Sequence, residues 1–224
     1  MKDDLSIRVY KNPQQQKFQN IPKALPDKHF TALFIGSRGS GKSTVMRNIV
    51  DRYKKTFPIE NRWMISPTAY QDDTLRPIID EDNIYTIYSE EIIHSIYDQI
   101  EADNKAQEAR IFEMTVKQMM RMKKYRDIDS PEDLDPEELE EKYAANLKKH
   151  FKHEEYLLIV DDSVGMFPPS AHKSELVRLF TKHRHLHISL MFSAQNFRSV
   201  PPIIRNNSML VFLFDTNDKE LAKL

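Results

Sequence analysis

Three of the four glycines in this 224-residue chain, Gly36, Gly39 and Gly41, fall within six positions of one another, in the stretch GSRGSGKST. The stretch matches the pattern G-x-x-x-x-G-K-S/T without a gap. Glycine lets the backbone N–H groups of a loop turn inward toward an anion, because no side chain obstructs the approach. The pattern therefore predicts a loop that binds the phosphates of a nucleotide.

The segments on either side of this loop fit the same prediction. HFTALFI (29–35) is a short apolar run typical of a strand, and STVMRNIVDRYKKTF after the loop has apolar residues at helical spacing. The N-terminus of that helix adds a positive dipole end next to the phosphates. We expect Lys42 to reach the β- and γ-phosphates of ATP and the Ser43 hydroxyl to bind Mg²⁺. The predicted nucleotide-binding residues are Gly36, Ser37, Arg38, Gly39, Ser40, Gly41, Lys42, Ser43 and Thr44.

A second carboxylate source for the metal follows a buried strand later in the chain. In YLLIVDDS the residues 156–160 are continuously apolar, as in a strand covered on both faces. Asp161 would lie at the carboxyl end of this strand, where ligands bind in open α/β sheets. We predict that Asp161 holds Mg²⁺, through a water molecule, and that Asp162 polarises the attacking water. A solvated acidic turn is the alternative.

A glutamine ends the next apolar strand, HISLMFSAQ. In P-loop folds of this kind the strand after the Asp161 strand inserts between it and the P-loop strand. Gln195 would then emerge beside the γ-phosphate, where its amide could orient water or report hydrolysis. A simple polar surface position is the alternative for Gln195.

The order of elements predicts an α/β fold: a P-loop NTPase of the ASCE or RecA-like type, in which a mainly parallel sheet forms the centre of a three-layer sandwich. We expect one ATPase domain over residues 1–224, with a charged helical insertion at about 90–152. Residues 90–155 contain 18 acidic and 11 basic residues, and the remainder contains 22 basic and 16 acidic residues. The basic remainder permits contact with phosphate backbones without requiring it.

Within the insertion, Ser130 and Asp135 have the positions of helix caps. The insertion also has a methionine cluster that indicates either the core of a helical hairpin or a partner-docking surface. Its members are Met114, Met119, Met120 and Met122.

Composition excludes several classes of protein. The chain has no cysteine, so it has no disulfide framework, and its formal net charge of −1 gives no overall basic signature. No apolar run approaches the roughly 18 residues that a membrane span needs. The start, MKDDLSIRVYKNP, lacks the apolar core of a signal peptide. These features favour a protein of a reducing compartment without a membrane span.

The full order of motifs resembles a known family. The P-loop, RWMISPT, the Asp161-Asp162 strand and VRLFTKHRHLHISLMFSAQNFRSVPPIIRNN are similar to the genome-packaging ATPases of large DNA viruses, the poxvirus-type branch of the FtsK–HerA superfamily. The resemblance covers the chain from about Phe30 to Asp215, except the insertion. Many members carry Asp-Glu where this chain has Asp161-Asp162, and the shorter side chain must approach the water more closely.

This resemblance implies an ATP-hydrolysing motor that moves double-stranded viral DNA into a preformed capsid. It implies a ring, a pentamer or hexamer, in which an arginine of one copy completes the ATP site of its neighbour. Arg184 matches that position best, with Arg205 and Arg178 as alternatives. Such an arginine finger is worth about 10³–10⁵ in rate. Capsid, portal or membrane-vertex proteins would be further partners. The implied location is the host cell interior, at a cytoplasmic viral factory or assembly site, or in association with the virion.

Other functions stay open at this point. A phage terminase-type packaging ATPase usually carries a metal-dependent nuclease domain as well. A small-molecule kinase would need an acceptor pocket and an arginine-rich lid, and a nucleotide-gated switch module would leave Asp162 and Gln195 without a role. Stimulation of ATP hydrolysis by DNA separates the two packaging motors from the kinase and the switch.

Overall fold

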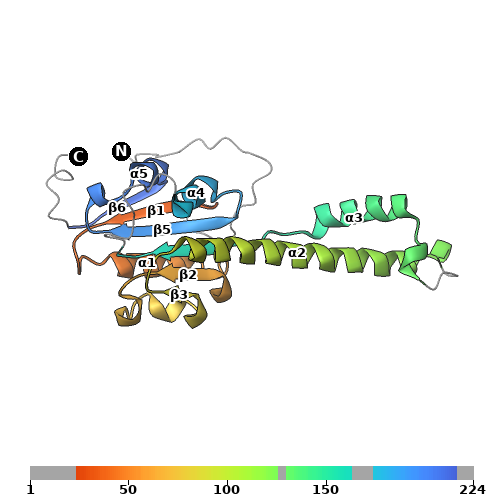
Figure 1. Cartoon of the computed structure of the whole chain (residues 1–224), viewed down its shortest axis with the longest axis horizontal. Coiled ribbons are helices and arrows are strands. Elements are labelled where there is room, and N and C mark those ends of the chain that lie inside the picture. The colour runs from red at the N-terminus through yellow and green to blue at the C-terminus, as the bar shows by residue number, and fades with distance from the viewer. Residues whose placement is uncertain (1–23, 126–129, 163–173, 216–224) are drawn as a thin grey trace, which may run out of the picture.

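The computed structural model describes residues 24–125, 130–162 and 174–215. A twisted sheet with helices on both faces forms the body, and a long helical arm projects from it (Figure 1). The strands are β1 (Thr31–Ile35), β2 (Arg62–Ile65), β3 (Ile84–Tyr85), β4 (Tyr156–Val160), β5 (Ile188–Ala194) and β6 (Leu210–Leu213). The α-helices are α1 (Lys42–Arg52), α2 (Glu90–Met120), α3 (Pro136–His150), α4 (Glu175–Lys182) and α5 (Pro202–Asn207).

The sheet has the strand order β3-β2-β4-β5-β1-β6, and every pairing among the described residues is parallel. Strand β5 lies between β4 and the P-loop strand β1. This confirms the position in the sheet that was predicted for the strand ending at Gln195. Because the strands are parallel, all their carboxyl ends meet at one edge of the sheet. This edge therefore collects the loops that follow β1, β2, β4 and β5.

Each face of the sheet has its own hydrophobic core, because side chains alternate between the two faces along each strand. Helices α2, α4 and α5 cover one face, where residues such as Leu158 and Leu190 are buried. Helix α1 covers the other face, where Phe34 and Met191 are buried. All residues of β4 and β5 are buried, as expected for strands covered on both sides. The predicted three-layer α/β fold with a parallel sheet is confirmed.

Helix α2 links the body to the arm. Ser89 caps its N-terminus by accepting a hydrogen bond from the N–H of Ile92, and its first turns pack against the sheet. Its remaining turns run alongside α3, where the Asn146 side chain donates to Thr115 Oγ1 over 2.9 Å (Figure 1). The far end has a small core of Met119, Tyr125 and Leu134, against which Met120 and Met122 pack.

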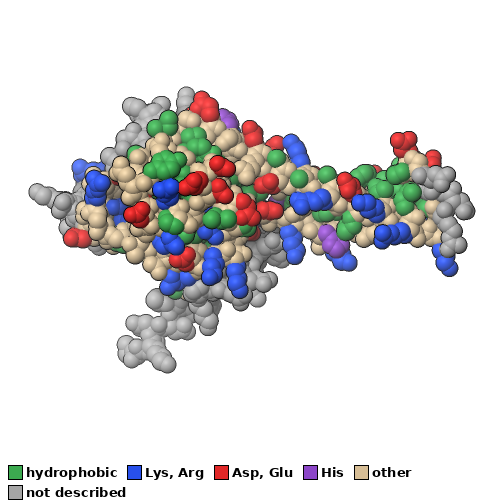
Figure 2. All heavy atoms as spheres, turned by 90° about the horizontal axis from the view of Figure 1, so that it is seen from below, with side chains coloured by type: hydrophobic (Ala, Val, Ile, Leu, Met, Phe, Trp, Pro, Cys, Tyr) green, Lys and Arg blue, Asp and Glu red, His purple; other side chains and the backbone are tan. Residues whose placement is uncertain are grey.

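The methionine cluster therefore forms a hairpin core for Met119, Met120 and Met122, whereas Met114 lies outside it in a shallow groove. The predicted caps are confirmed as well, since the side chains of Ser130 and Asp135 accept hydrogen bonds from backbone N–H groups. Basic and acidic side chains are interspersed along the arm and over the body on the face shown in Figure 2. Within residues 24–125, 130–162 and 174–215, no helix combines the length and the apolar character that a bilayer crossing requires.

Candidate functional site

The glycine loop joins β1 to α1 in the way that phosphate binding requires. Gly39 and Gly41 have φ angles of 76° and 95°, in the left-handed region that glycine adopts without steric cost. Gly41 is the N-cap residue of α1, so the N–H groups of the first helical turn point out of the helix beside the loop. The sequence pattern thus folds into a loop followed directly by a helix N-terminus, which is an anion-binding arrangement.

The Lys42 side chain lies against this loop. Its Nζ donates hydrogen bonds to the backbone carbonyls of Gly36 (2.8 Å) and Ser37 (3.0 Å). Burial lowers the pKa of Lys42, and the carboxylates of Asp161 and Asp162 oppose this shift. The ammonium group is therefore held at the loop, close to two carboxylates.

Asp161 is a buried carboxylate directly after β4, with 5% of its surface exposed. Its backbone N–H donates to the Ile65 carbonyl over 2.9 Å, which continues the ladder between β4 and β2. Its side chain accepts a hydrogen bond from the Ser193 hydroxyl on the neighbouring strand β5. Burial raises the pKa of Asp161, while the Ser193 hydrogen bond and the charge of Lys42 act in the opposite direction. A divalent cation beside this group would compensate the unfavourable burial of its charge.

Asp162 and Gln195 contact each other just past the carboxyl ends of the paired strands β4 and β5. Gln195 Nε2 donates to Asp162 Oδ1 over 2.8 Å, and the Asp162 N–H donates to Ser193 Oγ over 3.1 Å. Asp162 has a φ angle of 48°, an uncommon conformation for a residue other than glycine. The Ser193 hydroxyl thus contacts both aspartates, and the Gln195 amide fixes the orientation of the second one.

These groups line one cleft of about 450 Å³ at the carboxyl edge of the sheet. Its lining residues are Arg38, Gly39, Lys42, Ser43, Thr68, Gln71, Asp72, Asp73, Thr74, Asp161, Asp162 and Gln195. The remaining residues of the predicted phosphate loop shape the loop without lining the cleft, namely Gly36, Ser37, Ser40, Gly41 and Thr44.

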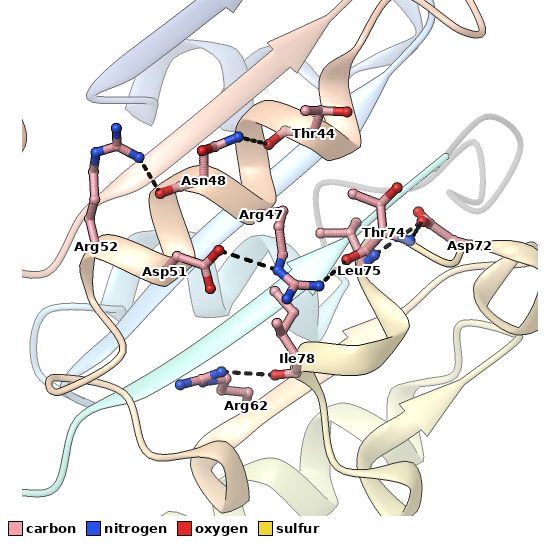
Figure 3. Close-up of polar contacts among 10 residues, drawn as sticks. All are labelled: Thr44, Arg47, Asn48, Asp51, Arg52, Arg62, Asp72, Thr74, Leu75 and Ile78. Atoms are coloured by element: carbon pink, nitrogen blue, oxygen red, sulfur yellow. Dashed lines mark hydrogen bonds and ion pairs between the residues drawn. The ribbon is translucent and has the colours of Figure 1, made fainter.

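Residues 68–74, which follow β2, contribute a part of the cleft that the sequence motifs did not indicate. Asp72 Oδ1 accepts hydrogen bonds from the N–H groups of Thr74 (2.7 Å) and Leu75 (3.0 Å), and this fixes the turn. Arg47 on α1 donates to the Thr74 carbonyl over 2.8 Å and pairs with Asp51 (Figure 3). The stretch SPTAYQDDT directly after an apolar strand was the available signal, because β2 ends at the same edge as β1 and β4.

None of the three arginine-finger candidates lines the cleft of its own chain. Arg184 is exposed in the turn before β5, at the edge of the sheet opposite to the P-loop, and its Nη2 lies 3.5 Å from Met209 Sδ. Arg178 on α4 pairs with Glu175, and Arg205 on α5 stacks over the Phe197 ring at 4.8 Å. Any action of Arg184 on a nucleotide therefore requires a second copy of the chain.

The fold and the cleft together define a P-loop nucleoside triphosphatase. Comparison with family models gives the family: the model described as "Type III restriction enzyme, res subunit" (ResIII) matches residues 8–183, and the chain belongs to this family. No curated protein sequence matches the chain.

Solved structures with the same fold include the cytoplasmic domain of EssC, with a TM-score of 0.51 and 14% identity over 85% of this chain. Two further solved structures match with lower TM-scores. One is the cytoplasmic domain of the Type VII secretion ATPase EccC from Thermomonospora curvata (TM-score 0.46, 16% identity, 84% of this chain). The genome packaging NTPase B204 from Sulfolobus turreted icosahedral virus 2, in complex with ATP-gammaS, also matches (TM-score 0.40, 14% identity, 86% of this chain and 77% of that chain). The chain spans only 34% of the EssC chain and 20% of the EccC chain. At 14% identity the likeness to EssC concerns the fold alone.

Proposed function

We propose that the chain is an ATP-hydrolysing motor that moves double-stranded DNA, and that its task is the packaging of a viral genome into a preformed capsid. One ATPase domain with a helical insertion at about 90–152 would carry out this function. The observation that carries the ATPase part is the meeting of Lys42, Asp161, Asp162 and Gln195 in one cleft. A nucleotide-binding module without hydrolysis has no need of the Asp162–Gln195 hydrogen bond next to a P-loop.

Each residue has a distinct role in this proposal. Backbone N–H groups of residues 36–44 and the Lys42 ammonium bind the phosphates of ATP. Ser43 and the buried carboxylate of Asp161 hold Mg²⁺, a fit supported by the burial of Asp161 and its place in the same cleft as Ser43. When bound, the metal ion would neutralise charge on the phosphates.

Asp162 and Gln195 act on the attacking water. Asp162 accepts a proton from the water or polarises it, and the hydrogen bond from Gln195 leaves one carboxylate oxygen of Asp162 available for this contact. The left-handed backbone at Asp162 supports this role, because uncommon conformations cluster at functional sites. Many members of the resembling family have a longer glutamate at the position of Asp162. In this chain Gln195 would position the water together with Asp162 and so compensate for the shorter side chain.

The role proposed for Arg184 requires that a neighbouring copy completes the site, because Arg184 does not line the cleft of its own chain. We propose a ring of five or six copies in which Arg184 reaches the ATP of the adjacent copy. The variant Arg184→Ala should then lose about 10³–10⁵ in hydrolysis rate. Mixing it with inactive Lys42→Ala chains should restore part of the rate, because a Lys42→Ala copy supplies Arg184 to a neighbour with an intact P-loop. Unchanged activity of Arg184→Ala would move the role to Arg205 or Arg178, tested in the same way.

DNA as the substrate rests on two arguments of different kinds. The motif order resembles poxvirus-type packaging ATPases, and the family to which the chain belongs is named after a restriction enzyme, a class of enzyme that acts on DNA. Capsid, portal or membrane-vertex proteins would dock the ring, at a viral assembly site inside the host cell or in the virion.

Steady-state ATP hydrolysis with and without linear double-stranded DNA tests the proposal. We expect DNA to stimulate hydrolysis by the wild type, and the stimulation to fall steeply with salt because phosphate contacts release counterions. Lys42→Ala should lower the rate by about 10²–10³-fold, the cost of removing one donor that stabilises the transition state. Lys54→Ala removes an exposed lysine just past α1 and is the matched control.

The alternatives give different results in the same experiment. Robust hydrolysis that is indifferent to DNA would contradict the motor and favour a kinase or switch module. Cleavage of the DNA in the presence of a divalent metal ion would favour a terminase-type enzyme with nuclease activity. Absence of hydrolysis under conditions where the chain forms a ring with bound ATP and DNA would contradict the ATPase role itself.

A further inference from the structure

Two histidines and a glutamate meet at the edge of the sheet opposite to the nucleotide cleft. Glu155 directly precedes β4, His187 directly precedes β5, and His29 lies two residues before β1. These three strands are neighbours in the order β4-β5-β1, so their amino ends place the three side chains together. The backbone hydrogen bond from the Tyr156 N–H to the His187 carbonyl (3.0 Å) extends the pairing of β4 and β5 to this point.

The donor atoms of the three side chains face one another. His29 Nε2 contacts Glu155 Oε2, and His187 Nδ1 lies 4.0 Å from the other carboxylate oxygen, Oε1. One ligand atom from each residue lies within 4.8 Å of the others. His29 is buried, and Glu155 and His187 are half-buried. The two histidines therefore face different oxygen atoms of the Glu155 carboxylate, in a site that is largely removed from solvent.

An ion pair between His29 and Glu155 explains only part of this arrangement. The Nδ1 atom of His187 is buried and makes no hydrogen bond within the described part of the chain. A buried polar atom without a partner costs about 1–3 kcal/mol. His187 also has a φ angle of 55°, the left-handed conformation that is uncommon outside glycine. A strained backbone that aims a nitrogen without a hydrogen bond at a carboxylate 4.0 Å away points to a ligand between them.

We propose that His29, Glu155 and His187 form a binding site for a divalent transition-metal ion, with zinc as the best-fitting ion. Imidazole nitrogen and carboxylate oxygen are common zinc ligands, whereas magnesium and calcium prefer oxygen ligands alone. A water molecule would complete a tetrahedron. The proton in the hydrogen bond between His29 and Glu155 passes to solvent when the metal takes both ligand atoms.

The geometry requires only small movements. Zn–N and Zn–O bonds of about 2.0–2.1 Å place tetrahedral ligand atoms about 3.3 Å apart. His187 Nδ1 and Glu155 Oε1 would thus approach each other by less than an ångström from their 4.0 Å separation. The backbone near Glu155 is already held, because the Asn61 side chain donates to the Glu155 carbonyl (3.4 Å) and to the Glu154 carboxylate (2.8 Å).

A small cavity adjoins the cluster on the side of His187. Its volume is about 120 Å³, and its lining includes His153, His185 and His187 together with three carboxylates. The carboxylates are those of Asp98, Glu101 and Glu154. Negative charge around the cavity attracts cations. His153 stacks on His187 with 3.9 Å between ring centroids and limits the rotation of the His187 ring.

A metal ion at this place would connect the segments that precede β1, β4 and β5. It would also fix the end of the arm, where the chain passes from α3 into β4. The site lies away from the P-loop and does not depend on the proposed motor function. Its loading should therefore raise the thermal stability of the chain in proportion to the logarithm of free zinc once the site is saturated.

Calorimetric titration of the untagged, chelator-treated full chain with ZnCl₂ tests the proposal. We expect saturable binding of one ion per chain to the wild type. His187→Asn removes the imidazole but keeps a residue that tolerates a positive φ, and it should weaken binding at least about 10-fold, as should Glu155→Gln. His94→Gln removes an exposed histidine of α2 and should leave the affinity unchanged.

Absence of saturable zinc binding by the wild type would overturn the proposal, as would equal affinity in the wild type, His187→Asn and Glu155→Gln. Titration with CoCl₂ keeps the test independent of the folding of the variants, because the geometry of bound Co²⁺ is visible in its absorption spectrum. Intense visible bands of four-coordinate Co²⁺ in the wild type support the site. A weak octahedral spectrum contradicts it.

Discussion

Replacement of Ser193 by alanine tests whether the two aspartates form one positioned unit. The Ser193 hydroxyl donates to the Asp161 carboxylate and accepts the N–H of Asp162, so one substitution releases both. A hydrogen bond to a charged group contributes about 1.5–3 kcal/mol to stability. Loss of a group that orients a metal ligand typically costs about 10–100-fold in metal affinity. We therefore expect the Mg²⁺ concentration for half-maximal ATP hydrolysis to rise by about 10–100-fold.

The pH profile gives a second measure of the same substitution. The Ser193 hydrogen bond lowers the pKa of Asp161 against the effect of burial, so its loss raises that pKa further. In the proposed site the metal binds the ionised carboxylate, so activity should decline at a higher pH in Ser193→Ala than in the wild type as the solution is acidified.

Ser189→Ala is the matched control for this experiment. Ser189 is buried on the same strand β5, and its hydroxyl accepts the Phe30 N–H over 3.3 Å, away from the cleft. Both variants should lose stability in chemical unfolding, but only Ser193→Ala should change the Mg²⁺ dependence. An unchanged Mg²⁺ dependence of Ser193→Ala, or an equal change in Ser189→Ala, would refute the assignment of Asp161 to the metal.

Substitutions at Gly41, His183 and Arg47 test the loop, a buried histidine and the turn at Asp72. Gly41→Ala places a Cβ at a φ of 95° and should destabilise the chain by about 1–2 kcal/mol in thermal unfolding, with weaker nucleotide binding. Burial lowers the pKa of His183 from 6.5 to about 4, so the unfolded chain binds the extra proton as the pH falls through this range. The free energy of unfolding should therefore drop by up to about 3 kcal/mol between pH 6.5 and 4 in the wild type. His183→Asn, measured by urea unfolding at a series of pH values, should show a smaller drop. Arg47→Met removes the hydrogen bond to the Thr74 carbonyl and should speed amide hydrogen exchange across Asp72–Leu75, while unchanged exchange would contradict the link between α1 and this turn.

The sequence predicts those parts of the cleft that are encoded in contiguous stretches. A phosphate loop needs its glycines, lysine and serine at fixed spacing, so the pattern from Gly36 to Ser43 is visible without a structure. Asp161 and Gln195 are predictable because each ends an apolar strand, and parallel strands end at a common edge of the sheet. The long helices of the arm are likewise apparent from their caps and their composition.

Other parts depend on the register between distant strands, which no local pattern reports. Ser193 contacts both aspartates only because β5 pairs with β4 in one register. The metal-site cluster likewise depends on the pairing of β1, β4 and β5. Its residues His29, Glu155 and His187 precede these strands and are far apart in the sequence. The turn at Asp72 was missed because its role appears only when β2 is placed beside β4 at the same edge.

Displacement of a triplex-forming strand from linear double-stranded DNA measures translocation most directly. We expect displacement by the wild type that requires ATP, increases with time and is absent in Lys42→Ala, whereas Lys54→Ala behaves as the wild type. Sustained ATP hydrolysis by the wild type without any displacement of the third strand would contradict the proposal that this P-loop ATPase moves DNA.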